Sequence, residues 1–401
     1  MSFIPKTGSF EGMKSLNKSA IMNIIRTQGP ISRADIAKLT KLTPPTVGSI
    51  VAELHQANFI KEETGAAKSQ GGRKPIMLSL DTSNYFIIGL YGAAEVITTV
   101  VSNLDGEIIY SHNQEVFTSP SQEEFLTMLK ECIQSTLRTN SLQYSSIVGI
   151  GVAMHGLVDP EEGIALFAPH LNLTQIPIKE SLEDTFSIPV LVENDVRALT
   201  LAESWYGKGK DVSDFICISV GRGIGSGIVL NHKIYTGKYN SAGEIGHTIV
   251  DVNGPRCKCG NYGCLEAFSS ESAILEKLKR GIRFGRETIL SETNLSIDSV
   301  FQAAEKGDSL AQEALEESGR YLGLAIANLI NIFTPSKVIL EGKLFEAGDL
   351  ILAPIRAMVD RSTLKSSPGS EAIEPSDLGK KGMAIGACTL VLRSIFKPGG
   401  F

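Results

Sequence analysis

One histidine and three cysteines fall within eighteen residues in the middle of the chain, and no other feature restricts the fold as tightly. Their pattern is His247-x9-Cys257-x-Cys259-x4-Cys264. One imidazole and three thiolates make a closed tetrahedral zinc set, and soft sulfur ligands exclude magnesium and calcium. Glycines between these residues let a short loop wrap around one ion. We expect a structural zinc ion; the alternative is three reduced thiols beside an unrelated histidine.

Length and composition exclude several classes of protein. With 401 residues, 42% hydrophobic and 20% charged, the chain is an ordinary globular protein of two to four domains at about 100–200 residues each. Six cysteines in this length do not form a disulfide scaffold. No apolar run approaches the ~20 residues of a membrane span, and the N-terminus lacks the pattern of a signal peptide. We therefore expect a cytoplasmic location without membrane insertion.

The net charge of −6 is unevenly distributed. Residues 1–80 carry a net charge of +6 and the remaining residues −12. A small basic head on an acidic body indicates that only the head meets an anionic partner.

The head has the pattern of three helices followed by two strands. Apolar spacing predicts a first helix over residues 15–28, which Gly29-Pro30 ends. Ser32 and Thr43 can cap the second and third helices. The side chains expected to be buried are Ile36, Ala37 and Leu39 in the second helix and Val47, Ile50, Val51 and Leu54 in the third. Strands are expected at 59–60 and 76–80, joined by a polar, glycine-rich hairpin.

This order is that of a winged helix-turn-helix, whose second helix of the turn pair enters the major groove of DNA. The side chains expected to face DNA are Arg33, Thr43, Pro45, Thr46 and Ser49. The segment Gly71-Gly72-Arg73-Lys74-Pro75 resembles a flexible arm that could place Arg73, followed by Lys74, in an adjacent minor groove. The alternative is a three-helix interaction or dimerisation module; the basic charge favours DNA.

Beyond residue 80, strand and helix patterns alternate, which predicts an α/β body in two lobes. We expect the head to be residues 1–80, the first lobe 81–195 and the second 196–401, with the last helix a candidate for returning to the first lobe. Strands are expected at 85–90, 96–103, 107–110, 147–153, 189–193, 215–220, 227–230 and 338–340, and helices at 122–137, 196–205, 272–280, 297–307 and 309–333.

Two further motifs are candidates for ligand binding. Val192-Glu-Asn-Asp195 ends a strand, where α/β proteins bind ligands, and its amide and carboxylate suit hydroxyl groups. The alternative is that Asp195 only caps the next helix. The alternating glycines of 220–227 could offer amides to a phosphate, or could form a structural hairpin. A strand follows them, so they are not a dinucleotide-binding motif.

Together these elements resemble the ROK family of repressors, open reading frames and sugar kinases, and the head resembles that of the family's transcriptional regulators. The motifs that carry the resemblance extend from about residue 15 to 392: ISRADIAKLTKLTPPTVGSIVAEL, GGRKP, VENDVRALTLAE, GEIGH, CKCGNYGCLE and NIFTPSKVIL. The resemblance implies a winged helix-turn-helix followed by a two-lobed actin/hexokinase-like body.

The resemblance also implies a sugar-binding site. The residues that match the family's hydroxyl-binding positions are Asn194, Asp195, Glu244, His247 and Glu266, with Asn172 as a further candidate. His247 can bind zinc through one ring nitrogen and turn the other toward a sugar, so that the metal orients a ligand-binding residue.

The kinase part of the family pattern is altered. Family kinases carry Asp-x-Gly-Gly-Thr-Lys where this chain has Leu90-Tyr-Gly-Ala-Ala-Glu95, so Leu90, Ala94 and Glu95 replace the aspartate, threonine and lysine. A glutamate near a triphosphate would repel it. The resemblance therefore implies no enzyme activity and no ATP or Mg²⁺. His155 stands where the family often has proline, either near the sugar pocket or as a satisfied loop histidine.

These patterns predict a sugar-responsive DNA-binding transcriptional regulator, a repressor of carbohydrate genes that binds operator DNA as a homodimer or tetramer. Sugar binding between the lobes would change the spacing of the heads, a coupling of typically about 1–3 kcal/mol. The alternatives are an ATP-dependent sugar kinase with a DNA-binding head and a regulator controlled by a protein partner. The helix at 309–333 is either a dimer or hinge element or an ordinary core helix.

Overall fold

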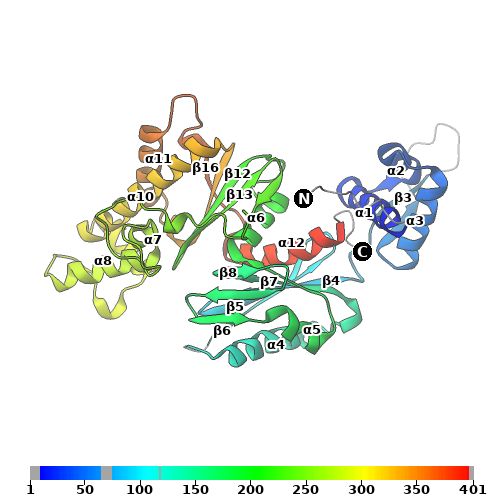
Figure 1. Cartoon of the computed structure of the whole chain (residues 1–401), viewed down its shortest axis with the longest axis horizontal. Helices are drawn as coiled ribbons and strands as arrows, with labels where there is room; N and C mark the ends of the chain where they lie inside the picture. The colour runs from blue at the N-terminus through cyan, green and yellow to red at the C-terminus, as the bar shows by residue number, and fades with distance from the viewer. Residues whose placement is uncertain (1–9, 65–74, 117–118, 397–401) are drawn as a thin grey trace. The chain divides into compact units, whose positions relative to one another are not determined.

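The computed structural model describes residues 10–64, 75–116 and 119–396, which form two compact units. The first unit runs to Asp195 and takes in the residues from Ala384 onward, and the second is Val196–Met383 (Figure 1). Within the described ranges, no helix is both long and apolar enough to cross a membrane.

The head of the first unit is a three-helix bundle with a three-stranded antiparallel sheet in the order β1-β3-β2. Ser32 Oγ accepts a hydrogen bond from Asp35 N, and Thr43 Oγ1 accepts one from Thr46 N, which confirms both caps. The elements are α1 (Phe10–Gln28), β1 (Ile31–Ser32), α2 (Arg33–Thr40), α3 (Pro44–Gln56), β2 (Ile60–Thr64) and β3 (Ile76–Leu80). The first helix thus starts five residues earlier than predicted.

The core of the head is built as predicted except at one position. Val47, Ile50, Val51 and Leu54 of α3 are buried, as are Ile36 and Ala37 of α2. Leu39 is 51% exposed, so its predicted burial is wrong. An α-helix turns about 100° per residue. Leu39 therefore points about 110° away from the direction midway between Ile36 and Ala37, which is the side of the helix that faces the core.

The rest of the first unit is a five-stranded sheet in the order β11-β7-β4-β5-β6. Its first three strands in sequence form an antiparallel meander, to which β7 and β11 add in parallel. The strands are β4 (Phe86–Gly92), β5 (Val96–Asn103), β6 (Ile108–Glu115), β7 (Ile147–Met154) and β11 (Val190–Asn194). A small sheet of β8 (Leu157–Asp159), β9 (Ile164–Ala168) and β10 (Leu173–Ile176) follows β7.

Helices cover both faces of this sheet. Figure 1 shows α4 (Gln122–Thr139) and α5 (Ile178–Phe186) on one face and α12 (Gly382–Phe396) on the other. Two glycines let α12 lie directly on the strands: a Cβ on Gly151 would fall 1.8 Å from the carbonyl oxygen of Ala387, and one on Gly89 would fall 2.4 Å from that of Ala384. The last helix of the chain is therefore built into the sheet of the first unit.

The second unit repeats the same topology. Its five strands have the order β14-β13-β12-β15-β16, again an antiparallel meander extended by two parallel strands. The strands are β12 (Phe215–Val220), β13 (Ile224–Leu230), β14 (Lys233–Tyr235), β15 (Lys337–Glu341) and β16 (Ile373–Pro375). The helices are α6 (Asp195–Tyr206), α7 (Glu266–Ser269), α8 (Glu271–Arg283), α9 (Ile297–Glu305), α10 (Ser309–Phe333) and α11 (Asp349–Ser362).

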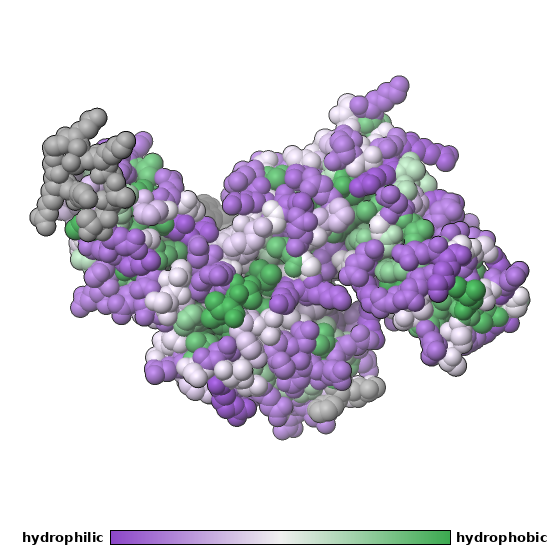
Figure 2. All heavy atoms as spheres, turned by 180° about the vertical axis from the view of Figure 1, so that it is seen from behind, coloured by the Kyte–Doolittle hydropathy of each residue, from purple (hydrophilic) through white to green (hydrophobic). Residues whose placement is uncertain are grey.

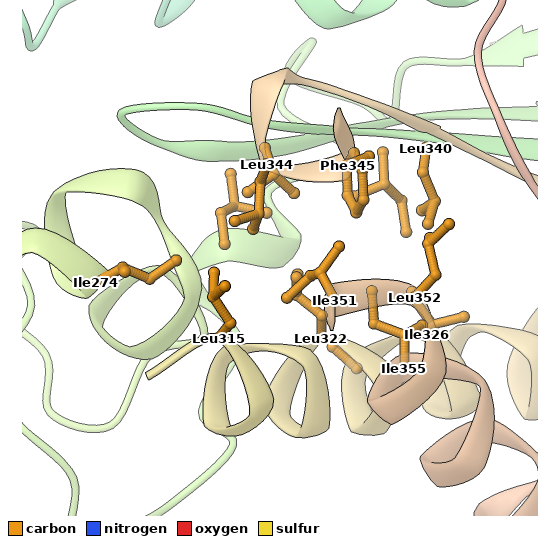
Figure 3. Close-up of a cluster of buried hydrophobic side chains, with 14 of the residues drawn as sticks. Ile274, Leu315, Leu322, Ile326, Leu340, Leu344, Phe345, Ile351, Leu352 and Ile355 are labelled. Carbon is orange, nitrogen blue, oxygen red and sulfur yellow. The ribbon is translucent and has the colours of Figure 1, made fainter. Parts of the chain in front are cut away.

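The core of the second unit forms between its sheet and these helices. In Figure 3, apolar side chains from α8, α10, β15 and α11 converge on one cluster, among them Ile274, Leu322, Leu340 and Ile355. Twelve residues of α10 are buried. Of the two interpretations of this helix, the contacts therefore support that of a core helix.

The surface is mostly hydrophilic on the face shown in Figure 2, and hydrophobic residues gather there only in separate patches. Single exposed apolar side chains such as Phe284 (86% exposed) and Val252 (80% exposed) are normal on a protein surface in water.

Candidate functional site

The predicted metal ligands lie together in the second unit. The donor atoms of His247, Cys257, Cys259 and Cys264 all lie within 4.8 Å of one another. The sulfurs of Cys259 and Cys264 are 3.7 Å apart, and Cys257 Sγ lies 3.7 Å from His247 Nδ1. With Zn–S bonds of about 2.3 Å, a tetrahedral site has S···S separations of ~3.8 Å. The spacing and the donor chemistry therefore fit zinc.

Glycine makes this close loop possible. Gly263 has a φ of +73°, and a Cβ there would lie 1.6 Å from the carbonyl oxygen of Asp251. Bridges Ile249–Cys264 and Arg256–Tyr262 draw the two sides of the loop together. The next turn is tied to the core, because Phe268 of α7 stacks on Tyr321 of α10 with ring centroids 4.0 Å apart.

The electrostatics of the cluster are compatible with a bound cation. Burial, followed by the neighbouring cysteines, raises the pKa of the Cys264 thiol to about 12. Burial also raises the pKa of Cys257, whereas a backbone hydrogen bond from Asn261 lowers that of Cys259. Three adjacent thiolates repel one another, and a bound divalent cation removes both that repulsion and the protons.

Three predicted hydroxyl-binding residues lie in or near this cluster in the second unit. His247 ends the 3-10 turn Ile245–His247, with Nδ1 on the side of the sulfurs. Glu266 is the first residue of α7; its Oε2 accepts a hydrogen bond from Ile224 N (3.2 Å), and its Oε1 lies 3.9 Å from Cys257 Sγ. Although Glu244 keeps an exposed surface, protein atoms around its carboxyl raise its pKa, and His247 and Arg197 oppose the rise.

Arg197 is a functional candidate that the sequence interpretation missed. It is only 3% exposed, and its Nη1 donates to the carbonyl oxygen of Asn240 at 2.6 Å. Its charge acts on Glu244. The only sequence signal is its place in the VENDVRA motif, directly after the Asn-Asp pair and one further residue.

The other three candidates lie in the first unit. Asn194 ends β11, and its Nδ2 donates to the carbonyl oxygen of Gly156 (3.0 Å) and to Asp195 Oδ1 (3.1 Å). Asp195 is 8% exposed and is the first residue of α6, so both interpretations of it remain open. Asn172 is exposed, with a φ of +56°, in the turn between β9 and β10.

Of the two ring nitrogens of His155, only Nδ1 has a hydrogen-bond partner among the described residues. His155 follows β7 and is 6% exposed, with Nδ1 3.0 Å from the carbonyl oxygen of Gly92. Its Nε2 is buried and has no hydrogen-bond partner among the described residues. Its ring stacks on that of His170 with centroids 5.4 Å apart. Burial lowers the pKa of His155 to about 4.

This depressed pKa predicts that the chain loses stability in acid. An unfolded histidine has a pKa near 6.5, so the folded state takes up the proton less readily. The stabilisation is fully present above about pH 6.5 and is lost as the pH falls through about 4, and the total loss is at most about 3.4 kcal/mol. We expect urea unfolding at pH 7 and pH 4.5 to show a smaller pH effect in His155→Phe than in the wild type. An equal pH effect in both chains would show that His155 titrates normally.

The residues that replace the kinase motif lie in and after strand β4 of the first unit. Leu90 is fully buried in the core of the first unit, and Ala94 and Glu95 lie in the β4–β5 hairpin. In the second unit, residues 221–223 form the tight turn of the hairpin between β12 and β13. Glu341 accepts a hydrogen bond from Ser219 (2.7 Å), and Lys343 is already paired with Asp298.

The predicted DNA-facing residues lie mostly on one side of α3. Pro45 and Ser49 are exposed, as is the cap Thr43, and Thr46 is half-buried with its hydroxyl 2.8 Å from that of Thr43. Arg33 lies on α2 and forms an ion pair with Glu62 of β2 (2.5 Å), so a DNA phosphate would have to share its charge. Arg73 and Lys74 lie outside the described residues.

A winged helix-turn-helix head on a body of two lobes with the same sheet topology defines a DNA-binding protein with an actin-like body. A family model described as winged helix-turn-helix DNA-binding matches residues 15–61, and the ROK family model matches residues 87–394. The chain belongs to the ROK family.

Its relatives include proteins that match it over nearly the whole of both chains. The chain is 34% identical over 389 residues to a putative xylose repressor of Caldicellulosiruptor sp., covering 96% of this chain and 97% of the relative. It is 33% identical over 388 residues to the DNA-binding transcriptional dual regulator NagC of Escherichia coli K12. This match covers 97% of this chain and 95% of NagC.

Solved structures give the same picture. A ROK family transcriptional regulator, described as a homologue of the E. coli Mlc protein, superimposes with a TM-score of 0.85 at 30% identity, covering 97% of this chain and 98% of the other. A ROK family glucokinase from Streptomyces griseus, solved with glucose and AMPPNP, superimposes with a TM-score of 0.67 at 27% identity. The superposition covers only 76% of this chain but 98% of the glucokinase.

Proposed function

We propose that the chain is a sugar-responsive DNA-binding transcriptional regulator that represses carbohydrate genes. The observation that carries this proposal is the joining of a winged helix-turn-helix head to a ROK family body. That body carries Asn194, Asp195 and Glu266 at positions where the family binds hydroxyls, and Leu90, Ala94 and Glu95 at the positions of the kinase motif. Relatives that match nearly the whole chain, head included, are named as a putative xylose repressor and as the transcriptional regulator NagC. A regulator of this kind acts where the DNA is, so we propose a cytoplasmic location.

In this proposal a structural zinc ion is held by His247, Cys257, Cys259 and Cys264. Four protein ligands leave no open position, so the ion supplies rigidity and no catalysis. Its support is the mutual distance of the four donor atoms. Because Glu266 begins α7 only two residues after Cys264, an ordered loop also orders this carboxylate.

The effector in this proposal is a sugar. The side chains proposed to bind its hydroxyl groups are those that match the family's hydroxyl-binding positions: Asn194, Asp195, Glu244, His247 and Glu266. Asn172 is a further candidate. Carboxylates and amides satisfy hydroxyls directionally, and a missing hydroxyl leaves a buried polar group unpaired. The nature of these side chains therefore selects a hydroxyl-rich ring.

We propose no phosphoryl transfer. The position of the kinase aspartate is the buried Leu90, and that of the lysine is an exposed glutamate, Glu95. Glu341 lies where the kinases have a glycine run, and its Oε2 accepts a hydrogen bond from Ser219 Oγ (2.7 Å). Carboxylates in these places oppose a bound triphosphate.

Operator binding requires two heads in this proposal, because a helix-turn-helix dimer reads two half-sites about one helical turn apart. We therefore propose a homodimer, or a tetramer made from it. Control by a protein partner instead of a sugar is the outcome to consider if no sugar binds.

We expect calorimetric titration of the zinc-loaded full chain with unphosphorylated and 6-phosphorylated sugars to find one specific ligand. Asp195→Ala should weaken the binding of that ligand by about 10- to 100-fold, because a hydrogen bond to a charged group contributes about 1.5–3 kcal/mol. Asp184→Ala, which removes an exposed carboxylate of α5 in the same unit, should bind as the wild type does.

Two results would contradict this proposal. Binding of no sugar would direct the search to a protein partner that changes operator affinity. Release of ADP from ATP in the presence of a sugar, abolished in Asp195→Asn, would establish a kinase with a DNA-binding head.

A further inference from the structure

The ring of His155 is held at the middle of three parallel strand ends. β4, β7 and β11 are neighbours, and their register aligns Gly92 with Met154 and Met154 with Asn194. His155 is the first residue after β7. Its Nδ1 contacts the carbonyl oxygen of Gly92 (3.0 Å), and Asn194 Nδ2 donates to the carbonyl oxygen of Gly156 (3.0 Å). Two hydrogen bonds thus tie residues 155–156 to the strand ends on both sides.

The contact with Gly92 determines which ring nitrogen carries the proton. A carbonyl oxygen can only accept, so Nδ1 must donate, and in a neutral imidazole Nε2 is then an acceptor. Burial keeps the ring neutral, with a pKa of about 4. Nε2 therefore presents a lone pair in a direction that the hydrogen bond of Nδ1 determines.

That lone pair is unmatched in this structure. Nε2 is buried, without a hydrogen-bond partner in the described part of the chain, and His155 as a whole is 6% exposed. A buried acceptor without a donor is unfavourable, and native structures contain few of them. Stacking on His170, with ring planes 25° apart, holds the ring in place but supplies no donor to Nε2 at the stacked face.

The position of His155 indicates what donor is missing. In α/β proteins, ligands bind beyond the carboxyl ends of the strands. His155 occupies that edge directly beside Asn194 and Asp195, the hydroxyl-binding residues of the proposed function. Gly156, with a φ of +89°, holds this turn against β9, where a Cβ would lie 2.2 Å from the carbonyl oxygen of Phe167.

We propose that Nε2 of His155 accepts a hydrogen bond from one hydroxyl of the bound sugar, which makes His155 a specificity-determining residue. The inference rests on the proposed sugar-binding function. The ligand must bring a proton to this point, so an unsubstituted hydroxyl suits it and a phosphate or methoxy oxygen without a proton does not. Because Nε2 is closed to water in this structure, the ring or the turn that carries His170 must shift when the sugar enters.

The test is a coupling experiment on the full chain. D-Xylose, D-glucose and N-acetyl-D-glucosamine are titrated calorimetrically, followed by each monodeoxy analogue of the sugar that binds. We expect one deoxy analogue to bind the wild type at least 10-fold more weakly than the parent sugar. His155→Phe should bind the parent and that analogue equally. The control His170→Phe keeps a stacked ring and Nε2 of His155, and should still discriminate between the two sugars.

The outcomes separate this inference from the function on which it rests. If a sugar binds but His155→Phe distinguishes every deoxy analogue as the wild type does, the inference is overturned and sugar binding stands. If the wild type binds no sugar, both are overturned. A measurement on the wild type avoids any folding defect of the variant: in ¹⁵N-histidine-labelled protein, the Nε2 resonance of His155 should move toward that of a hydrogen-bonded acceptor when sugar is added. An unmoved resonance would overturn the inference.

Discussion

Cys259→Ser is expected to release the metal and to weaken sugar binding together. Cys259 is exposed, so the substitution removes one ligand without disturbing core packing. A site left with three ligands should bind zinc at least about 100-fold more weakly, because even changes in residues behind the ligands cost about 10- to 100-fold. We expect metal analysis to fall from one zinc ion per chain to a small fraction of that.

Stability should fall with the metal. Structural zinc in small domains contributes about 10–16 kcal/mol of binding free energy that is available for folding. Here the loop is only part of a unit with its own large core, so we expect the second unit to lose a few kcal/mol and to remain folded. Sugar affinity should fall because Glu244, His247 and Glu266 all belong to, or adjoin, the loop that the ion orders.

The matched control is Lys258→Ser, at the exposed position next to Cys259 in the same loop. It should keep full zinc content and sugar affinity. A zinc-free Cys259→Ser chain with unchanged sugar affinity would refute the coupling between metal and sugar. Full zinc content in Cys259→Ser would refute the assignment of Cys259 as a ligand.

The parts of the fold that local chemistry determines were predictable from the sequence. The caps at Ser32 and Thr43 depend on residues three positions away, and α10 follows from an apolar pattern that runs over its whole length, so all three are where the pattern places them. Strands β3, β5 and β12 have the predicted bounds because each is a compact run bordered by turn residues.

Elements with weak local patterns were missed. The strands β8 to β10 have only three to five residues with mixed exposure, and α11 carries Pro354 within its length. The two units have sheets with the same strand order, but this duplication cannot be seen in the sequence, because the two sheets do not share a residue pattern. Such features depend on contacts between distant parts of the chain.

In the candidate site, too, local patterns could be predicted from the sequence and contacts between distant residues could not. Spacing predicts the four metal ligands, because zinc chemistry limits the donor types and a short loop limits their separation. It does not predict that Arg33 pairs with Glu62, twenty-nine residues away, or that Nε2 of His155 lacks a partner. Pairing across the fold is determined only when the elements pack.

Ser49→Asp is expected to weaken specific operator binding strongly. Ser49 is exposed on the side of α3 that also carries Pro45 and Thr46, close to the beginning of the helix that would enter the major groove. A carboxylate at this position removes a base-facing hydroxyl and meets the negative potential of DNA. One lost contact costs about 1–3 kcal/mol, and the proposed dimer loses it twice, so affinity should fall at least about 30-fold.

The measurement is a titration, at fixed salt, of a duplex recovered by in-vitro selection with the full-length wild-type chain. Ser141→Asp makes the same chemical change at an exposed turn of the body and should bind that duplex as the wild type does. Circular dichroism should show both variants folded, because the buried side of α3 is untouched. Unchanged affinity in Ser49→Asp would remove α3 from the DNA interface and return the head to the alternative of a three-helix interaction module. Equal losses in both variants would instead mean that added negative charge, wherever it lies, weakens binding, and that the face of α3 has no special part in reading the operator.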